Sequence, residues 1–215
     1  EEKTMTPINE SPKPALPTPR SAAKEDSVRA EFEMALEIVK YGNGILREKA
    51  KAVAVVTPEL RNLAAEMIET MHSARGVGLA APQVGRRERM CVIDIPEGCE
   101  DDPATEDFNR KIPQPMVLFN PVILAVSGKN CGKEGCLSFP NMSGEIERAN
   151  QVTCQYMDEE GALKVVTVRG FLARAIQHET DHLNGILYVD HYSPEQMKSR
   201  EKRLAKLAAK NGGVR

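Results

Sequence analysis

The stretch QHETDHLNG, residues 177–185, places His178, Glu179 and His182 in the pattern H-E-x-x-H. Positions four residues apart lie on the same face of a helix, so the two imidazoles can bind one divalent metal ion. Glu179 lies beside the first histidine and can accept the proton of a water molecule that the ion activates. The pattern therefore indicates metal-assisted hydrolysis, carried by a helix.

The residues around the motif favour a buried helix over a chance match. Gly170 precedes the predicted helix, residues 171–183, and Asn184-Gly185 ends it. Buried histidines and a glutamate without a metal would leave polar groups unsatisfied at a high cost in free energy. The helix has the apolar side chains needed to bury this face, namely Phe171, Leu172, Ala175, Ile176 and Leu183.

Outward from this helix, apolar segments predict strands at 90–95, 116–119, 122–126, 146–148, 151–157 and 163–169. One helix is predicted from Pro58 to a stop before Gly76, and a last helix after Pro194. Residues 96–115 are interpreted as a long surface insertion and residues 127–140 as a turn. These patterns predict an α+β fold of mostly antiparallel strands packed around the motif helix, with a terminal helix.

The composition divides the 215 residues into three parts. Residues 1–30 are rich in proline and polar residues, which predicts a disordered or loosely attached arm. Residues 31–193 form the expected catalytic domain, and residues 194–215 form a basic C-terminal helix and tail. The net charge of −2 excludes a strong overall attraction to nucleic acid or anionic membranes. Five cysteines without regular spacing favour a reducing compartment.

A catalytic zinc-type site needs a third protein ligand, and the sequence offers four candidates. Tyr188 occupies the position where metzincins have a third histidine. Glu201 lies in a strongly basic helix, where a surface ion pair is the simpler role. His191 follows closely on the helix stop, and Cys136 stands between predicted strands, where a lone cysteine is most often a small buried hydrophobe. The residues alone leave these alternatives open.

Three segments in order resemble the signature motifs of peptide deformylases. They are GVGLAAPQVG (76–85), EGCLS (134–138) and QHETDHLNG (177–185). Together they span most of the domain, from about residue 36 to 192. The resemblance implies a metal-dependent hydrolase that removes the N-formyl group from the formyl-methionine of newly synthesised proteins and releases formate.

The resemblance also implies the metal site. In that family the ion is held by the cysteine of the second motif and both histidines of the third, which are Cys136, His178 and His182 here. A thiolate and two imidazoles suit Fe(II), Zn, Co or Ni. The family's native ion is typically Fe(II), often replaced by Zn or Ni, so we expect one Fe(II) ion per chain.

The same resemblance assigns roles in the reaction. Glu179 is expected to be the general acid and base. The side chain of Gln83 and the backbone N–H of Leu137 are expected to bind the negatively charged oxygen of the tetrahedral intermediate. Gly78 is expected to contact the backbone of the substrate, which lies along this loop like an added strand.

Other residues are expected to shape the pocket. The candidate walls for a methionine side chain are Val77, Leu79, Phe171 and Ala175, each of which could equally belong to the core. Glu134 and Arg148 match an ion pair of the family. Ser143 stands where many relatives direct an arginine at the substrate, so preferences beyond the first substrate residue are left open.

Rival functions, partners and a cellular compartment can also be predicted from the sequence. A zinc peptidase with Glu201 as third ligand and a binding protein without activity are the rival interpretations. The basic C-terminal helix is either a solvated face or a surface that binds ribosomal RNA phosphates. We expect a monomer without membrane attachment in the bacterial cytoplasm. A plastid or mitochondrion is the alternative, with the N-terminal arm as a remnant of a transit peptide.

Overall fold

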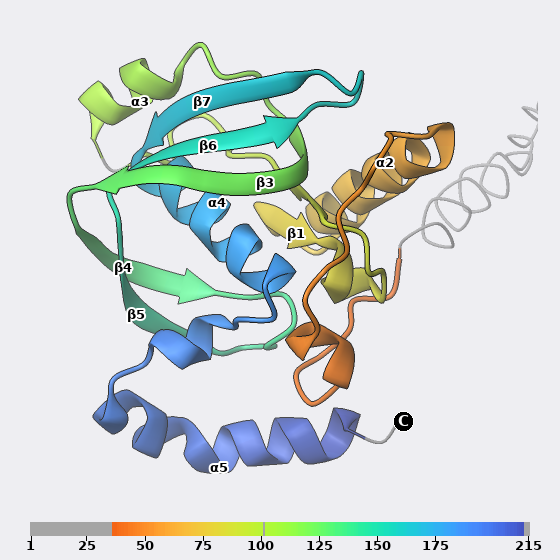
Figure 1. Cartoon of the computed structure of the whole chain (residues 1–215). Helices are drawn as coiled ribbons and strands as arrows, with labels where there is room; N and C mark the ends of the chain where they lie inside the picture. The colour runs from red at the N-terminus through yellow and green to blue at the C-terminus, as the bar shows by residue number, and fades with distance from the viewer. Residues whose placement is uncertain (1–35, 101, 213–215) are drawn as a thin grey trace, which may run out of the picture. The chain divides into compact units, whose positions relative to one another are not determined.

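Two antiparallel sheets surround the motif helix in the computed structural model, which describes residues 36–100 and 102–212 (Figure 1). The predicted arm at residues 1–30 lies outside the described residues. The larger sheet has the order β1 (Gly78–Ala80), β2 (Met90–Ile93), β3 (Met116–Ser127), β6 (Gln151–Met157) and β7 (Leu163–Arg169). The smaller sheet pairs β4 (Asn130–Gly135) with β5 (Ser143–Arg148). The predicted α+β fold is confirmed.

The helices of the described residues connect and cover these sheets. The α-helices are α2 (Pro58–Ser73), α3 (Pro103–Asn109), α4 (Gly170–Leu183) and α5 (Pro194–Asn211). Short 3-10 helices are η1 (Gly44–Arg47), η2 (Ala81–Val84) and η3 (Tyr188–His191). None of these helices combines the length and the apolar character that a bilayer crossing requires.

Strand β2 is apolar throughout because helices cover both of its faces. Successive side chains of a strand point to opposite sides. Met90 and Val92 pack in a cluster with residues of α2, whereas Cys91 and Ile93 pack in a cluster with residues of α4. The motif helix α4 is therefore held against the larger sheet by its own apolar residues. Its histidines contact Glu134 and Cys136 of the β4 segment, whereas Glu179 lies beside Gly78 of β1.

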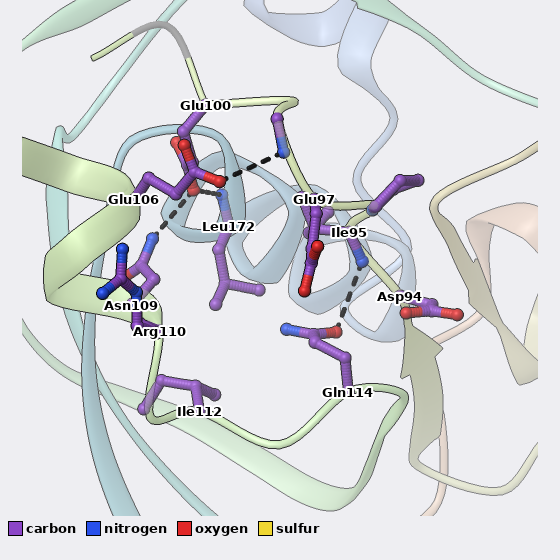
Figure 2. Close-up of a pocket in the computed structure, with 12 residues that line it drawn as sticks. Asp94, Ile95, Glu97, Glu100, Glu106, Asn109, Arg110, Ile112, Gln114 and Leu172 are labelled. Carbon is purple, nitrogen blue, oxygen red and sulfur yellow. Dashed lines mark hydrogen bonds between the residues drawn. The ribbon is translucent and has the colours of Figure 1, made fainter. Parts of the chain in front are cut away.

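The segment predicted as a surface insertion instead fixes the start of α4. Arg169, at the N-cap of α4, makes no side-chain capping bond. Glu100 supplies that cap, because its carboxylate accepts a hydrogen bond from the backbone N–H of Phe171 at 2.7 Å. It accepts a second from the backbone N–H of Leu172 at 3.2 Å (Figure 2). Asn109, the last residue of α3, donates to the same carboxylate at 2.8 Å. The insertion thus contains a helix and contacts the element that carries the motif.

Three other predictions of local structure were wrong. Residues 130–135, interpreted as part of a turn, form β4, whose exposed face accounts for its polar sequence. The predicted break at Asn120-Pro121 lies inside one long strand, β3, as a local register shift. Asn120 adopts the left-handed conformation and bonds both backbone groups of Val53 through its amide. The loop 76–85 contains the short elements β1 and η2.

Helix α5 packs on the rest of the described chain. Ser193 caps its first turn, and Leu204 is buried in a cluster with Leu46, Phe139 and Tyr188. Two of its arginines donate to backbone carbonyls at the start of β5 and just before it. Arg200 donates to Ser143 and Arg203 donates to Asn141. The helix is therefore anchored by its own core residue and by polar contacts.

Candidate active site

Helix α4 and the end of β4 bring three ligand atoms together. His178 and His182 lie one turn apart on α4, and Cys136 follows the last residue of β4. The Cys136 Sγ atom lies 3.2 Å from His182 Nε2. One donor atom from each of the three residues lies within 4.8 Å of the others. The sequence separates Cys136 from the helix by more than 30 residues, and the fold closes this distance.

The donor set fits a divalent metal ion. Glu134 Oε2 is 3.0 Å from Nδ1 of His178, which leaves the Nε2 atom of that ring free for an ion. A carboxylate behind a ligating histidine is a recurrent feature of metal sites, because it fixes the tautomer and the orientation of the ring. A thiolate with two imidazoles suits Fe(II), Zn, Co or Ni.

Glu134 is the centre of a buried charge network. Arg148 donates to both of its carboxylate oxygens, at 2.9 and 3.1 Å, and Arg174 donates at 2.7 Å. Burial alone would raise the pKa of Glu134, but hydrogen bonds from His178 and Arg148 outweigh it and hold the pKa well below its usual range. Arg148 also pairs with Asp181. The predicted pair of Glu134 and Arg148 is present, whereas Arg174 was not singled out because an arginine within an apolar helix pattern carries no motif signal.

Glu179 is a buried carboxylate beside the three ligand atoms. Burial raises its pKa to about 7. Its Oε2 atom has no hydrogen-bond partner among the described residues. Its Oε1 atom faces Gly78, where an added Cβ would overlap the carboxylate. A bound cation would favour the ionised form of this group, so the site would offer a carboxylate with a free oxygen.

Gln83 is aimed at the same centre. Its Oε1 atom accepts a hydrogen bond from the backbone of Ala80 at 2.8 Å, which fixes the direction of the amide. Its Nε2 atom then lies 3.4 Å from Cys136 Sγ and 3.2 Å from Ser138 Oγ. The side chain is buried, although the sequence places it in a loop. An amide held in this way is a preorganised donor.

Leu137 lies next to Cys136 at the mouth of the same pocket. Its carbonyl oxygen accepts a hydrogen bond from Lys40 Nζ at 2.9 Å, which fixes the peptide plane. Its N–H has no acceptor within the part of the chain that the structure describes. Lys40 and Ser138 are contributors that sequence reasoning missed, because neither residue forms part of a spacing pattern with the histidines.

A pocket of about 340 Å³ opens in front of these groups. Of the predicted wall residues, Val77, Phe171 and Ala175 line it, as does Gly78. Leu79 does not, and that prediction was wrong. Side chains alternate along β1, so Leu79 is fully buried on the other side, in the cluster with residues of α2.

The other candidate third ligands make different contacts. Tyr188 is buried in the cluster near α5, where its ring packs on that of His178 with 6.1 Å between the ring centroids. His191 contacts Asp181 at 2.8 Å. Glu201 is exposed on α5. Within the described residues, the group of potential metal ligands that includes the motif histidines is completed by Cys136. The geometry therefore disfavours a zinc peptidase that uses Glu201.

Comparison with known proteins gives a consistent result. The sequence profile of the polypeptide deformylase family matches residues 35–198. A peptide deformylase of Clostridium acetobutylicum is 46% identical over 153 residues, which cover 71% of this chain and 91% of the relative. The structure of a peptide deformylase from Ehrlichia chaffeensis matches with a TM-score of 0.71 at 35% identity, over 80% of this chain and 96% of the other. One from Arabidopsis thaliana matches with a TM-score of 0.72 at 34% identity, over 81% and 91%.

The fold and the candidate Cys/His/His metal site define a metal-dependent amide hydrolase. The chain belongs to the peptide deformylase family. It is an enzyme that removes the N-formyl group from the N-terminal formyl-methionine of newly synthesised proteins and releases formate.

Proposed function

We propose that Cys136, His178 and His182 hold one divalent ion and that Glu179 is the general acid and base of deformylation. The observation that carries this proposal is the buried Glu179 carboxylate, with an unpartnered oxygen beside three converging ligand atoms. When bound, the ion supplies a Lewis acid that polarises the formyl group and makes water a stronger acid.

The protein side chains divide the remaining work. Glu179 accepts a proton from the attacking water and returns it to the leaving amine, because its buried carboxylate has an oxygen with no hydrogen-bond partner among the described residues. The amide of Gln83 and the N–H of Leu137 donate to the oxygen that becomes negative in the tetrahedral intermediate. Each such donor is worth on the order of 3 kcal/mol.

The substrate is proposed to extend along the free edge of β1. Gly76, Val77 and Gly78 line the pocket, and Gly78 lets a peptide backbone approach Glu179 closely. Val77, Phe171 and Ala175 would surround the methionine side chain. This arrangement is an instance of strand addition, in which main-chain bonds give affinity and a pocket gives specificity.

Replacing Glu179 tests the mechanism. Glu179→Gln preserves the shape of the side chain but cannot accept a proton. We expect retention of the metal, measured by elemental analysis, and a fall in turnover of a formyl-Met peptide of about 10²-fold or more. Turnover close to that of the wild type would remove Glu179 from the mechanism.

Fe(II) is the proposed native ion, with Zn, Ni or Co as substitutes. The donor set supports this choice only as a class, because a thiolate and two imidazoles accept all four ions. Peroxide should inactivate the iron enzyme, and Ni(II) or anaerobic Fe(II) should restore it. A zinc-only preparation with full activity, unaffected by peroxide, would contradict the choice of iron.

Partners and location are also proposed. The exposed lysines of α5 support a contact with ribosomal RNA near the emerging substrate. A monomer is proposed because the ligands and the pocket come from one chain, and light scattering tests it.

The bacterial cytoplasm is the proposed compartment, and a plastid or mitochondrion is the alternative. Cell fractionation followed by immunodetection decides between these compartments.

A further inference from the structure

Two cationic residues belong to the lining of the catalytic pocket. Arg75 and Lys133 both line it, and both are exposed. The carboxylate next to Lys133 does not offset them, because Glu134 is buried and bonded to Arg148 and Arg174. Away from Glu179, the pocket therefore presents an excess of positive charge to solvent.

The two cations differ in how well they are compensated. Arg75 follows helix α2 in the left-handed conformation, and it has no ion pair within residues 36–100 and 102–212. Lys133 lies directly opposite Glu145 in the register of β4 and β5. Directly opposed side chains of antiparallel strands are close neighbours, so Glu145 offsets part of the charge of Lys133. Arg75 is the stronger of the two positive groups.

Their places along the chain define which part of a substrate they meet. Arg75 lies three residues before Gly78, and Lys133 lies three residues before Cys136. Both segments lead away from the catalytic groups, and in the described residues β1 pairs only with β2 and β4 only with β5. An extended peptide advances about 3.3 Å per residue. In a chain with its formyl group at Cys136 and Glu179, the second and third residues lie roughly 3 to 7 Å beyond the first, and this is the part of the substrate that the two cations are proposed to meet.

We propose that Arg75 and Lys133 make this enzyme prefer formyl-methionyl chains with acidic side chains at the second and third positions. The inference rests on the proposed placement of the substrate along β1. Attraction of acidic residues and repulsion of basic ones act on the same two positions, so they add.

The test compares peptides that differ only in charge. Formyl-Met-Asp-Asp-amide, formyl-Met-Asn-Asn-amide and formyl-Met-Lys-Lys-amide are assayed for kcat/KM, and the blocked carboxyl end removes a competing charge. The acidic-to-basic ratio is kcat/KM for the Asp-Asp peptide divided by kcat/KM for the Lys-Lys peptide. Exposed ion pairs are weak, so we expect this ratio to be about 3 to 10 at low salt. The ratio should fall toward one at 0.5 M salt, because screening shortens the range of the interaction.

Four single variants separate this preference from nonspecific effects. Arg75→Gln should lower the acidic-to-basic ratio most, and Lys133→Gln should lower it less. Glu145→Gln should raise it, because Lys133 loses its opposing carboxylate. Lys49→Gln, an exposed lysine that lines none of the described pockets, should leave the ratio unchanged. All four positions are exposed, so the melting temperature should stay near that of the wild type.

The outcomes are distinct from those of the catalytic proposal. Normal turnover of the neutral peptide with a ratio of one, or a ratio that Arg75→Gln does not change, would overturn the charge preference alone. Turnover that is insensitive to Glu179→Gln would overturn the catalytic proposal. A preference that is weakened by Arg75→Gln, less so by Lys133→Gln, and that disappears at high salt would support the inference.

Discussion

Cys131 and Cys136 lie five residues apart but have different surroundings. Cys131 is exposed on the outer face of β4. Cys136 lies beyond the end of the strand, where the chain turns and its sulfur meets His182 and Gln83. Composition and spacing could not distinguish the two environments, whereas the resemblance of EGCLS to a family motif selected Cys136.

The two cysteines provide a matched pair of variants. Cys136→Ser should reduce bound metal and activity sharply, because a site with three protein ligands has none to spare. Cys131→Ser should retain both, since its sulfur touches no other proposed ligand. Elemental analysis and a turnover assay measure the two quantities. Loss of metal from the Cys131 variant, with retention in the Cys136 variant, would reverse the ligand assignment.

Residue roles were predictable where a spacing rule or a family motif applied. The i, i+4 rule placed His178 and His182 together, and the EGCLS motif selected Cys136. Leu79 was misplaced because strand alternation decides its direction, and a three-residue strand inside a loop-like sequence gives no periodicity to read. Arg174 was missed because its partner Glu134 lies 40 residues away in the sequence.

At the scale of elements, the cap on α4 comes from a distant segment. Glu100 accepts hydrogen bonds from the first N–H groups of the helix, which carry positive partial charge. Removal of such a cap typically costs about 1 kcal/mol. Glu97 and Glu100 line a cavity beside α3 that is separate from the catalytic pocket (Figure 2). Glu97 makes no hydrogen bond among the described residues, so it is the natural control.

We therefore expect Glu100→Ala to lower the free energy of unfolding by about 1 kcal/mol. Glu97→Ala should change it by less than about 0.5 kcal/mol, as for most surface substitutions. Denaturant titration followed by circular dichroism measures both. Equal stability of the two variants would show that the capping contact contributes nothing.

Elements with strong periodicity were predicted well, and irregular ones were not. The predicted bounds of α4, β6 and β7 agree with the structure to within a residue. Strand β4 is short of apolar residues because one of its faces is exposed and its buried position is a charged Glu134. Helix α3 has only seven residues and gives no amphipathic repeat. Both depend on tertiary contacts that a local pattern does not contain.

At the scale of the whole molecule, the basic helix α5 has an inner and an outer side. Leu204 is buried, whereas Lys198, Lys202 and Lys206 are exposed at a spacing of four residues. The helix can therefore pack on the domain through one side and still present its lysines to a partner on the other, so packing does not exclude the proposed contact with ribosomal RNA. Truncation would remove Leu204 from the core, so substitution of the lysines is the cleaner experiment.

Replacing Lys198, Lys202 and Lys206 by glutamine should weaken binding to ribosomes and flatten its salt dependence, because fewer counterions are released. Turnover of a short formyl peptide should stay within a few fold. The matched control replaces Lys49, Lys51 and Lys111, which are also exposed. Cosedimentation with ribosomes over a salt series measures the effect. Equal binding by both triple variants would rule out α5 as the contact surface.

The proposed ligands come from two separate pieces of the fold, and this has a mechanical consequence. Cys136 extends from the β4–β5 hairpin, whereas the histidines belong to a helix that is packed on the larger sheet. An ion held by all three acts as a cross-link between the hairpin and the body of the enzyme. Binding to the folded form alone stabilises that form. Chelation should thus remove the Lewis acid and, at the same time, loosen the hairpin that forms one wall of the substrate pocket.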